Sequence, residues 1–134
     1  MERVVAQQLN AYVSKHGLRE VFQSAYVEHH STETALLRVK NDLAMHVDRN
    51  GAALLVLLDL SAAFDTIDHD ILLKRLAERF GITGRALSWI SSYLGNRKES
   101  VVIEGCHSEE KPLCDGVPQG SVLGPLLFSF YTSE

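Results

Sequence analysis

Residues 51–59 read Gly-Ala-Ala-Leu-Leu-Val-Leu-Leu-Asp, an apolar run that ends in a single carboxylate. Seven consecutive apolar residues behind a glycine are typical of a strand buried on both faces, so we expect a central strand over 52–58. Because a lone ionised carboxylate is costly to bury, Asp59 is expected at the mouth of this strand, facing a cation or strong hydrogen-bond donors. The pattern indicates a metal or phosphoryl site, and a carboxylate that caps a nearby helix is the alternative.

The chain has 134 residues, a length that fits one domain with one hydrophobic core. Its residues are 46% hydrophobic and 22% charged, which is typical of a globular protein. The net charge of −4 and the pI near 5.8 differ from those of an independent nucleic-acid binder, whose pI usually exceeds about 9. Any nucleic-acid contact is therefore expected on a local patch or on parts outside this chain. Two cysteines, Cys106 and Cys114, form no disulfide framework or zinc motif, and no apolar run reaches the ~18 residues of a membrane span. We expect a soluble, intracellular protein that does not enter a membrane.

Local patterns place the remaining elements. Helical spacing of apolar residues predicts helices over about 2–15, 32–48 and 69–80, with Ser31 or Thr32 and then Asp68 as N-caps of the last two. A fourth helix is expected after Thr83, and a strand over 100–104 is expected to turn back toward a partner near 111–114. In the second helix, the apolar stripe is formed by Leu36, Val39, Leu43 and Val47.

The second informative stretch is 116–125, which holds three glycines and two prolines in ten residues before an apolar helical pattern. Glycines and prolines at this density indicate a specific backbone shape that allows another chain or a ligand to approach closely. The alternative interpretation is an ordinary tight turn into a helix. Gln119 in this loop can donate and accept hydrogen bonds. His29 and His30 are adjacent, do not share a face, and are interpreted as surface residues, while Arg75 is expected on a solvated helix face.

Taken together, these motifs resemble the fingers and palm of the reverse transcriptase of a LINE-type retrotransposon, one without long terminal repeats. The resemblance covers about residues 18–133. The motifs occur in the order Gln23-Ser-Ala-Tyr26, His30-Ser-Thr-Glu-Thr-Ala-Leu-Leu37, Leu58-Asp-Leu-Ser-Ala-Ala-Phe-Asp-Thr-Ile-Asp-His69, Ser92-Tyr-Leu94 followed by Arg97, and Gly116-Val-Pro-Gln-Gly-Ser-Val-Leu-Gly-Pro125.

The resemblance implies a role for each matching residue. Asp59 matches the first catalytic aspartate, which ligates both Mg²⁺ ions of a two-metal nucleotidyl transfer. Leu60 is expected to present its backbone near the triphosphate, and Phe64 is expected to exclude a ribose 2′-hydroxyl. Gln119 and Gly120 are expected to contact the incoming nucleotide and the template base. The implied partners are an RNA template, a DNA primer and deoxynucleoside triphosphates.

The resemblance also implies the fold class, an α+β arrangement of helices packed on a partial antiparallel palm sheet. The expected organisation is one partial domain, with fingers-like helices over about 1–50 and an incomplete palm over about 51–134. Two departures stand out: Val27 replaces a basic residue, and the family's aromatic-Ala-Asp-Asp hairpin would follow the helix after Pro125. With one of the metal carboxylates present, we expect no polymerase activity from this chain by itself, and no strong independent binding of nucleic acid.

Two other classes of function are weighed against this one. A bacterial receiver domain has a similar length and a phosphoacceptor aspartate at the end of a central strand, but it also needs an acidic pair after an N-terminal strand, where this chain is helical. A non-catalytic retrotransposon relic, or a fragment that binds RNA weakly, is the other alternative, since an incomplete palm sheet would leave apolar edges exposed.

Overall fold

The computed structural model describes residues 1–133 and divides them into two compact units. The first unit joins residues 1–19 to the chain from Ala62 onward, and the second comprises Glu20–Ser61. The secondary structure is mixed, with helices and small antiparallel sheets, as the predicted α+β class requires.

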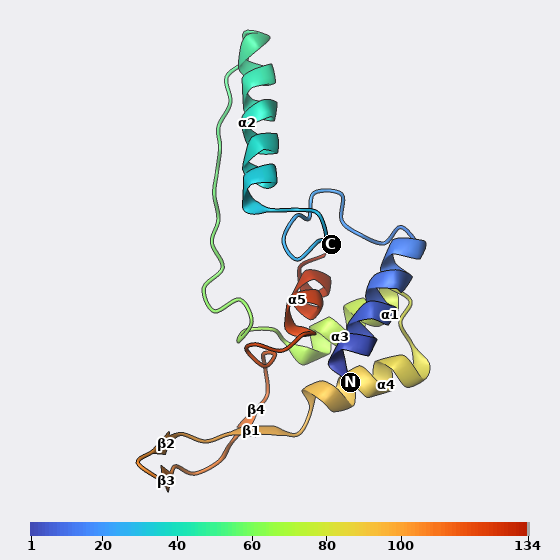
Figure 1. Cartoon of the computed structure of the whole chain (residues 1–134), viewed down its shortest axis with the longest axis vertical. Helices are drawn as coiled ribbons and strands as arrows, with labels where there is room; N and C mark the ends of the chain where they lie inside the picture. The colour runs from blue at the N-terminus through green and yellow to red at the C-terminus, as the bar shows by residue number, and fades with distance from the viewer. Residues whose placement is uncertain (134) are drawn as a thin grey trace. The chain divides into compact units, whose positions relative to one another are not determined.

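Four helices build the first unit: α1 (Glu2–Lys15), α3 (His69–Glu78), α4 (Gly84–Leu94) and α5 (Gly124–Thr132). Helix α3 packs against both α4 and α5 (Figure 1). Apolar side chains from these helices and the loops between them form one hydrophobic core, which consists of Ala6, Leu9, Val13, Ile67, Leu72, Leu76, Phe80, Ile82, Ile90, Leu94, Val117, Leu123, Leu127 and Phe130.

The bounds of the helices follow from local chemistry. Asp68 is the N-cap of α3, where its Oδ1 accepts a hydrogen bond from the backbone N–H of Ile71 at 2.9 Å. The predicted cap is therefore confirmed. Helix α1 has the predicted bounds, and α4 begins directly after Thr83, as expected.

A hairpin arm connects α4 to the loop before α5 and extends away from the helices (Figure 1). Strand β1 (Arg97–Glu99) pairs antiparallel with β4 (Lys111–Leu113), and beyond a break in the ladder β2 (Val102–Ile103) pairs with β3 (Cys106–His107). Of the predicted strand over 100–104, only Val102–Ile103 is a strand, and it pairs with Cys106–His107, whereas the predicted partner near 111–114 pairs with β1. Ser100 and Val101 lie at the break, where the N–H of Val101 donates to Oγ of Ser108 instead of to a strand partner.

The second unit contains α2 (Thr32–Asp48), whose bounds match the prediction. Ser31 caps it through a reciprocal capping box with Thr34: Oγ of Ser31 accepts from the Thr34 N–H, and Oγ1 of Thr34 accepts from the Ser31 N–H. However, α2 has no buried residue, so the predicted apolar stripe from Leu36 to Val47 faces no core in this structure.

The predicted central strand over 52–58 is wrong. Residues 51–60 are drawn in Figure 1 as a chain without secondary structure, and Leu54 to Leu58 are all exposed. A strand is stable only when neighbouring strands accept and donate its backbone hydrogen bonds, and among residues 1–133 no segment pairs with this one. The specific palm sheet predicted from the resemblance is therefore absent from the described chain.

Candidate functional site

The turn that contains Phe64 and the loop that follows Gly116 are held together by backbone hydrogen bonds. The N–H of Gly116 donates to the carbonyl of Ile67 at 2.8 Å, and the N–H of Val117 donates to the carbonyl of Phe64 at 2.9 Å. These two segments are about fifty residues apart in the chain. The structure therefore brings together two of the motifs that the sequence singled out.

Gly116 permits this approach because it has no side chain. Its φ is +83°, and a Cβ at this position would lie 2.9 Å from the Asp65 carbonyl oxygen and 3.1 Å from that of Phe64. Both contacts are with backbone atoms, which cannot turn aside as a flexible side chain could. The glycine is thus required by its conformation and by the closeness of the turn.

Two side chains strengthen the same junction. The carbonyl of Gly116 accepts a hydrogen bond of 2.7 Å from Nε2 of His69, at the start of α3. The half-buried ring of Phe64 packs against Phe128 of α5, with ring centroids 5.4 Å apart. His69 follows the N-cap residue Asp68 directly, and the local sequence gives no signal of its contact with the loop.

The loop is also fixed at its far end, close to α5. The backbone N–H of Val122 donates to Oε2 of Glu2 at 2.7 Å, and the hydroxyl of Tyr93 donates to Oε1 of the same carboxylate at 3.1 Å. Burial raises the pKa of the Tyr93 phenol, and the negative charge of Glu2 acts in the same direction. The carboxylate of Glu2 therefore joins α1, α4 and the loop.

Between these anchors, Gln119 and Gly120 form the exposed tip of the loop. The N–H of Ser121 donates to the Pro118 carbonyl at 3.1 Å, closing a tight turn around the two residues, and Gly120 has a φ of +81°. Gln119 makes no hydrogen bond within residues 1–133, so its amide is available to a ligand. Phe64, Gln119 and Gly120 all belong to the first unit.

Asp59 and Leu60 belong to the second unit and lie in the exposed segment without secondary structure. In the described chain, Asp59 makes no hydrogen bond or ion pair. The described residues contain no group of three or more His, Cys, Asp or Glu side chains that could hold a metal ion. Asp59 is therefore a single carboxylate without a cluster of further ligand side chains around it in the described chain.

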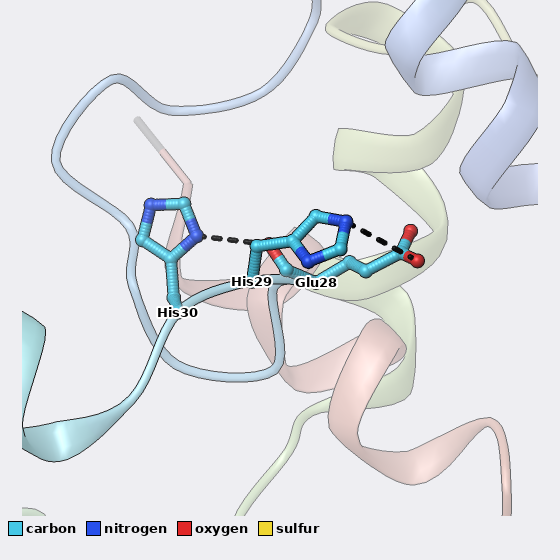
Figure 2. Close-up of polar contacts among 3 residues, drawn as sticks. All are labelled: Glu28, His29 and His30. Carbon is cyan, nitrogen blue, oxygen red and sulfur yellow. Dashed lines mark hydrogen bonds and ion pairs between the residues drawn. The ribbon is translucent and has the colours of Figure 1, made fainter.

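The two adjacent histidines are exposed surface residues, as the sequence indicates. Nδ1 of His30 lies 3.0 Å from the backbone carbonyl of Glu28, and Nε2 of His29 lies 3.6 Å from the Glu28 carboxylate; Figure 2 marks both contacts with dashed lines. The side chains of His29 and Glu28 are 89% and 87% exposed. This contact is a solvated pair that carries attraction only when the histidine is protonated.

Arg75 was expected on a solvated face, and this expectation is wrong. Its guanidinium donates to the backbone carbonyl of Tyr131 and, at 2.8 Å, to that of Ser133, while it also lies over the Tyr131 ring. Arg75 thus satisfies carbonyls that the last turn of α5 leaves without helical partners. The helix pattern of α3 alone gives no signal for this contact.

Comparison with known proteins shows which family the chain resembles. Residues 1–134 match the family described as "Reverse transcriptase (RNA-dependent DNA polymerase)". The chain is 35% identical over 113 residues, 84% of its length, to the RNA-directed DNA polymerase from mobile element jockey of Drosophila funebris. It is 32% identical over 134 residues, its full length, to the polymerase of the same name from Drosophila melanogaster.

The chain spans 12% and 14% of the lengths of these two relatives. Within residues 1–133, none of the helices is both long enough and apolar enough to cross a membrane. The similarity extends over both compact units, including the segment that holds Asp59 and the loop that holds Gln119.

Proposed function

The chain belongs to the reverse transcriptase family, and on this premise we propose that it contributes part of the nucleotide-binding site of an RNA-directed DNA polymerase of the LINE type. Within that site, Phe64, Gln119 and Gly120 would contact the incoming deoxynucleotide and the template base, and Leu60 would lie near the triphosphate. An RNA template and a DNA primer would be the macromolecular partners. Membership of this family also removes the reason to consider a receiver domain.

One observation carries the proposal: the backbone hydrogen bonds that join the Phe64 turn to the Gly116 loop. A nucleotide site needs an aromatic surface and hydrogen-bonding groups held in a fixed relation to each other. Here the half-buried Phe64 supplies the surface and the exposed Gln119 supplies the amide. The glycine at the junction supports the proposal because it lets the two segments approach to backbone contact.

Asp59 would be one ligand of the Mg²⁺ ions that this family uses. Magnesium is held by one or two protein carboxylates together with phosphates and water, and in nucleotidyl transfer it stabilises charge on the reacting oxygens. The described residues offer a single carboxylate at this position and no cluster around it. We therefore expect the isolated chain to show no primer extension with Mg²⁺.

A chimeric polymerase tests the proposal. The 134 residues replace the matching segment of the Drosophila melanogaster jockey polymerase, which aligns with the whole chain. The chimera is expected to extend a DNA primer on an RNA template. Asp59→Asn should lower the rate by about a hundredfold or more, because a carboxylate ligand is lost. Phe64→Ala should keep the activity and admit ribonucleotides.

Asp42→Asn is the matched control, since Asp42 is an exposed aspartate of α2 in the same compact unit as Asp59. It removes one negative charge and is expected to leave the rate unchanged. If Asp42→Asn and Asp59→Asn slow the chimera equally, the assignment of Asp59 is wrong. If Phe64→Ala leaves sugar selection unchanged, Phe64 does not contact the sugar.

A further inference from the structure

Two side chains of α4, Trp89 and Tyr93, form a stack with Arg97, the first residue of β1. The rings of Trp89 and Tyr93 are nearly parallel, with an interplanar angle of 13° and centroids 5.6 Å apart. The guanidinium carbon of Arg97 lies 4.8 Å from the centroid of the Tyr93 ring, and Nε of Arg97 donates to the Tyr93 carbonyl at 2.9 Å. Trp89 and Tyr93 lie one helical turn apart in α4, whereas Arg97 reaches the Tyr93 ring from beyond the end of the helix.

A groove of about 440 Å³ adjoins this stack. Its walls come from α1 and from the first half of α4 with the loop before it, and all of them belong to the first compact unit. Trp89 is the member of the stack that lines the groove. The ring that ends the stack is therefore also a wall of an open groove.

The groove wall is mainly apolar, and its hydrogen-bonding side chains are Gln8, Tyr12, Thr83 and Trp89, of which Tyr12 already donates to the Phe80 carbonyl. Val5, Leu9, Ile82 and Ile90 supply the apolar surface, and no charged residue lines the groove. Gln8 and Thr83 also line it, and neither side chain makes a hydrogen bond within residues 1–133. An amide and a hydroxyl can both donate and accept, so they suit the edge of a heterocyclic base.

Positive charge lies on either side of Trp89 in the chain, at Arg85 of α4 and at Arg97 of β1. Arg85 precedes Trp89 by one helical turn and is exposed, and it forms no ion pair within the described chain. Arg97 follows at the other end of the stack. The carboxylate of Glu2 contacts the stack by accepting a hydrogen bond from the Tyr93 hydroxyl, and it also accepts one from the Val122 N–H.

We propose that this groove binds an unpaired base of single-stranded nucleic acid, stacked against Trp89. The base would be the next planar group in the row Arg97–Tyr93–Trp89, and Gln8 and Thr83 would bond its edge. A neighbouring phosphate would lie near Arg85. Aromatic stacking combined with flanking cations is the usual chemistry of single-strand binding.

The alternative occupant, a proline-rich peptide, would also fit an aromatic-lined groove. It carries no anionic backbone, so it would leave the two arginines that flank Trp89 without a complementary charge. The charge pattern therefore favours nucleic acid. The proposal does not depend on Asp59 or on polymerase activity, and its failure would leave the proposed function standing.

The chain contains a single tryptophan, so its fluorescence reports on this site alone. The full chain is titrated at low salt with a ten-nucleotide oligouridylate and, separately, with a ten-nucleotide oligodeoxythymidylate. Stacking of a base on Trp89 is expected to quench the emission, with a dissociation constant in the range of about 10⁻⁴–10⁻⁶ M because the chain is acidic overall. Comparison of the two titrations shows whether RNA or DNA is preferred.

Variants then test the individual contacts, with binding followed by the anisotropy of a dye-labelled oligonucleotide. Trp89→Ala should weaken binding by about tenfold, whereas Trp89→Phe should retain most of the affinity because it keeps a ring for stacking. Arg85→Ala should weaken binding severalfold and lower the salt dependence by about one phosphate contact. Lys74→Ala, which removes one exposed charge from α3 outside the groove, should change the affinity by less than about twofold.

Several results would overturn the proposal. They are the absence of quenching by both oligonucleotides, equal binding by Trp89→Ala and the original chain, or quenching by a decaproline peptide and by neither oligonucleotide. If circular dichroism shows that Trp89→Ala is unfolded, the exposed residues Gln8 and Arg85 decide the question. The proposal is then overturned if neither Gln8→Ala nor Arg85→Ala weakens binding.

Discussion

Gly116 shows how one residue can fix the relation between two distant segments. Its positive φ of +83° and its approach to the backbone of Phe64 and Asp65 are separate constraints. Gly116→Ala should therefore lower the free energy of unfolding by roughly 2–4 kcal/mol, from conformational strain together with a steric clash. Urea denaturation measures the change.

Gly120→Ala is the matched control, because Gly120 lies in the same loop with a φ of +81° and has no atom within 4 Å of a Cβ built at that position. Gly120→Ala should lower the free energy of unfolding only through conformational strain, by about 1–2 kcal/mol. If both alanine variants lower the free energy of unfolding by the same amount, the steric clash expected at Gly116 does not contribute.

At this scale the sequence reveals residue types but not their distant partners. Three side chains form hydrogen bonds with residues far along the chain: Glu2 with a residue 120 positions away, His69 with one 47 positions away, and Arg75 with one 58 positions away. A local pattern contains no information about such contacts. The glycine-rich motif itself could be recognised, because its composition differs from that of its surroundings.

The structural elements divide according to whether local chemistry is sufficient to form them. Helices were predicted well, since the caps at Ser31 and Asp68 and the apolar spacing lie within each helix. The run over 52–58 was predicted wrongly, because a strand depends on partners that its own residues do not specify. The pairing within the hairpin could not be predicted either, because nothing in the local sequence indicates the break at Ser100 that separates its two short ladders.

The N-cap of α2 offers a test of element stability. Because α2 buries no residue, its helicity depends on its caps more than on packing. Ser31→Ala should destabilise the helix by about 1 kcal/mol, seen as faster amide hydrogen exchange within α2. The same variant should return the pKa of Glu33 toward its ordinary value, because the Ser31 hydroxyl lowers that pKa by hydrogen bonding.

The direction of the pH effect follows from this lowered pKa. Glu33 favours the folded helix when ionised, so its contribution is present above the ordinary pKa of about 4.3 and is lost as the pH falls through the lowered value. An NMR titration of the carboxyl group follows the change. Thr83→Ala is the control: Thr83 is the N-cap of α4 without a side-chain cap bond, so exchange in α4 should change little.

At the scale of the whole molecule, the exposed apolar run is the feature with the largest consequence. Leu57 is 82% exposed in an extended, unpaired segment with no charge between residues 52 and 58. Such segments pair with copies of themselves, so the isolated chain should associate as its concentration rises. Leu57→Lys should suppress this association by roughly tenfold or more in light scattering.

Leu37→Lys provides the comparison, since Leu37 is 63% exposed but lies in α2. A general gain in solubility from the added charge would make the two variants behave alike. Association through the extended run would make Leu57→Lys effective and Leu37→Lys nearly ineffective. Sedimentation velocity distinguishes the two outcomes.

The backbone frame around Gly116 also determines how freely this region can vary. Two of the hydrogen bonds that position the loop run from the N–H groups of Gly116 and Val117 to main-chain carbonyls, so these two do not depend on side-chain identity. Positions at the exposed tip, such as Gln119, can therefore be diversified without displacing the loop. A combinatorial library at the tip, built with Gly116 kept constant, would sample new recognition chemistry on an unchanged scaffold.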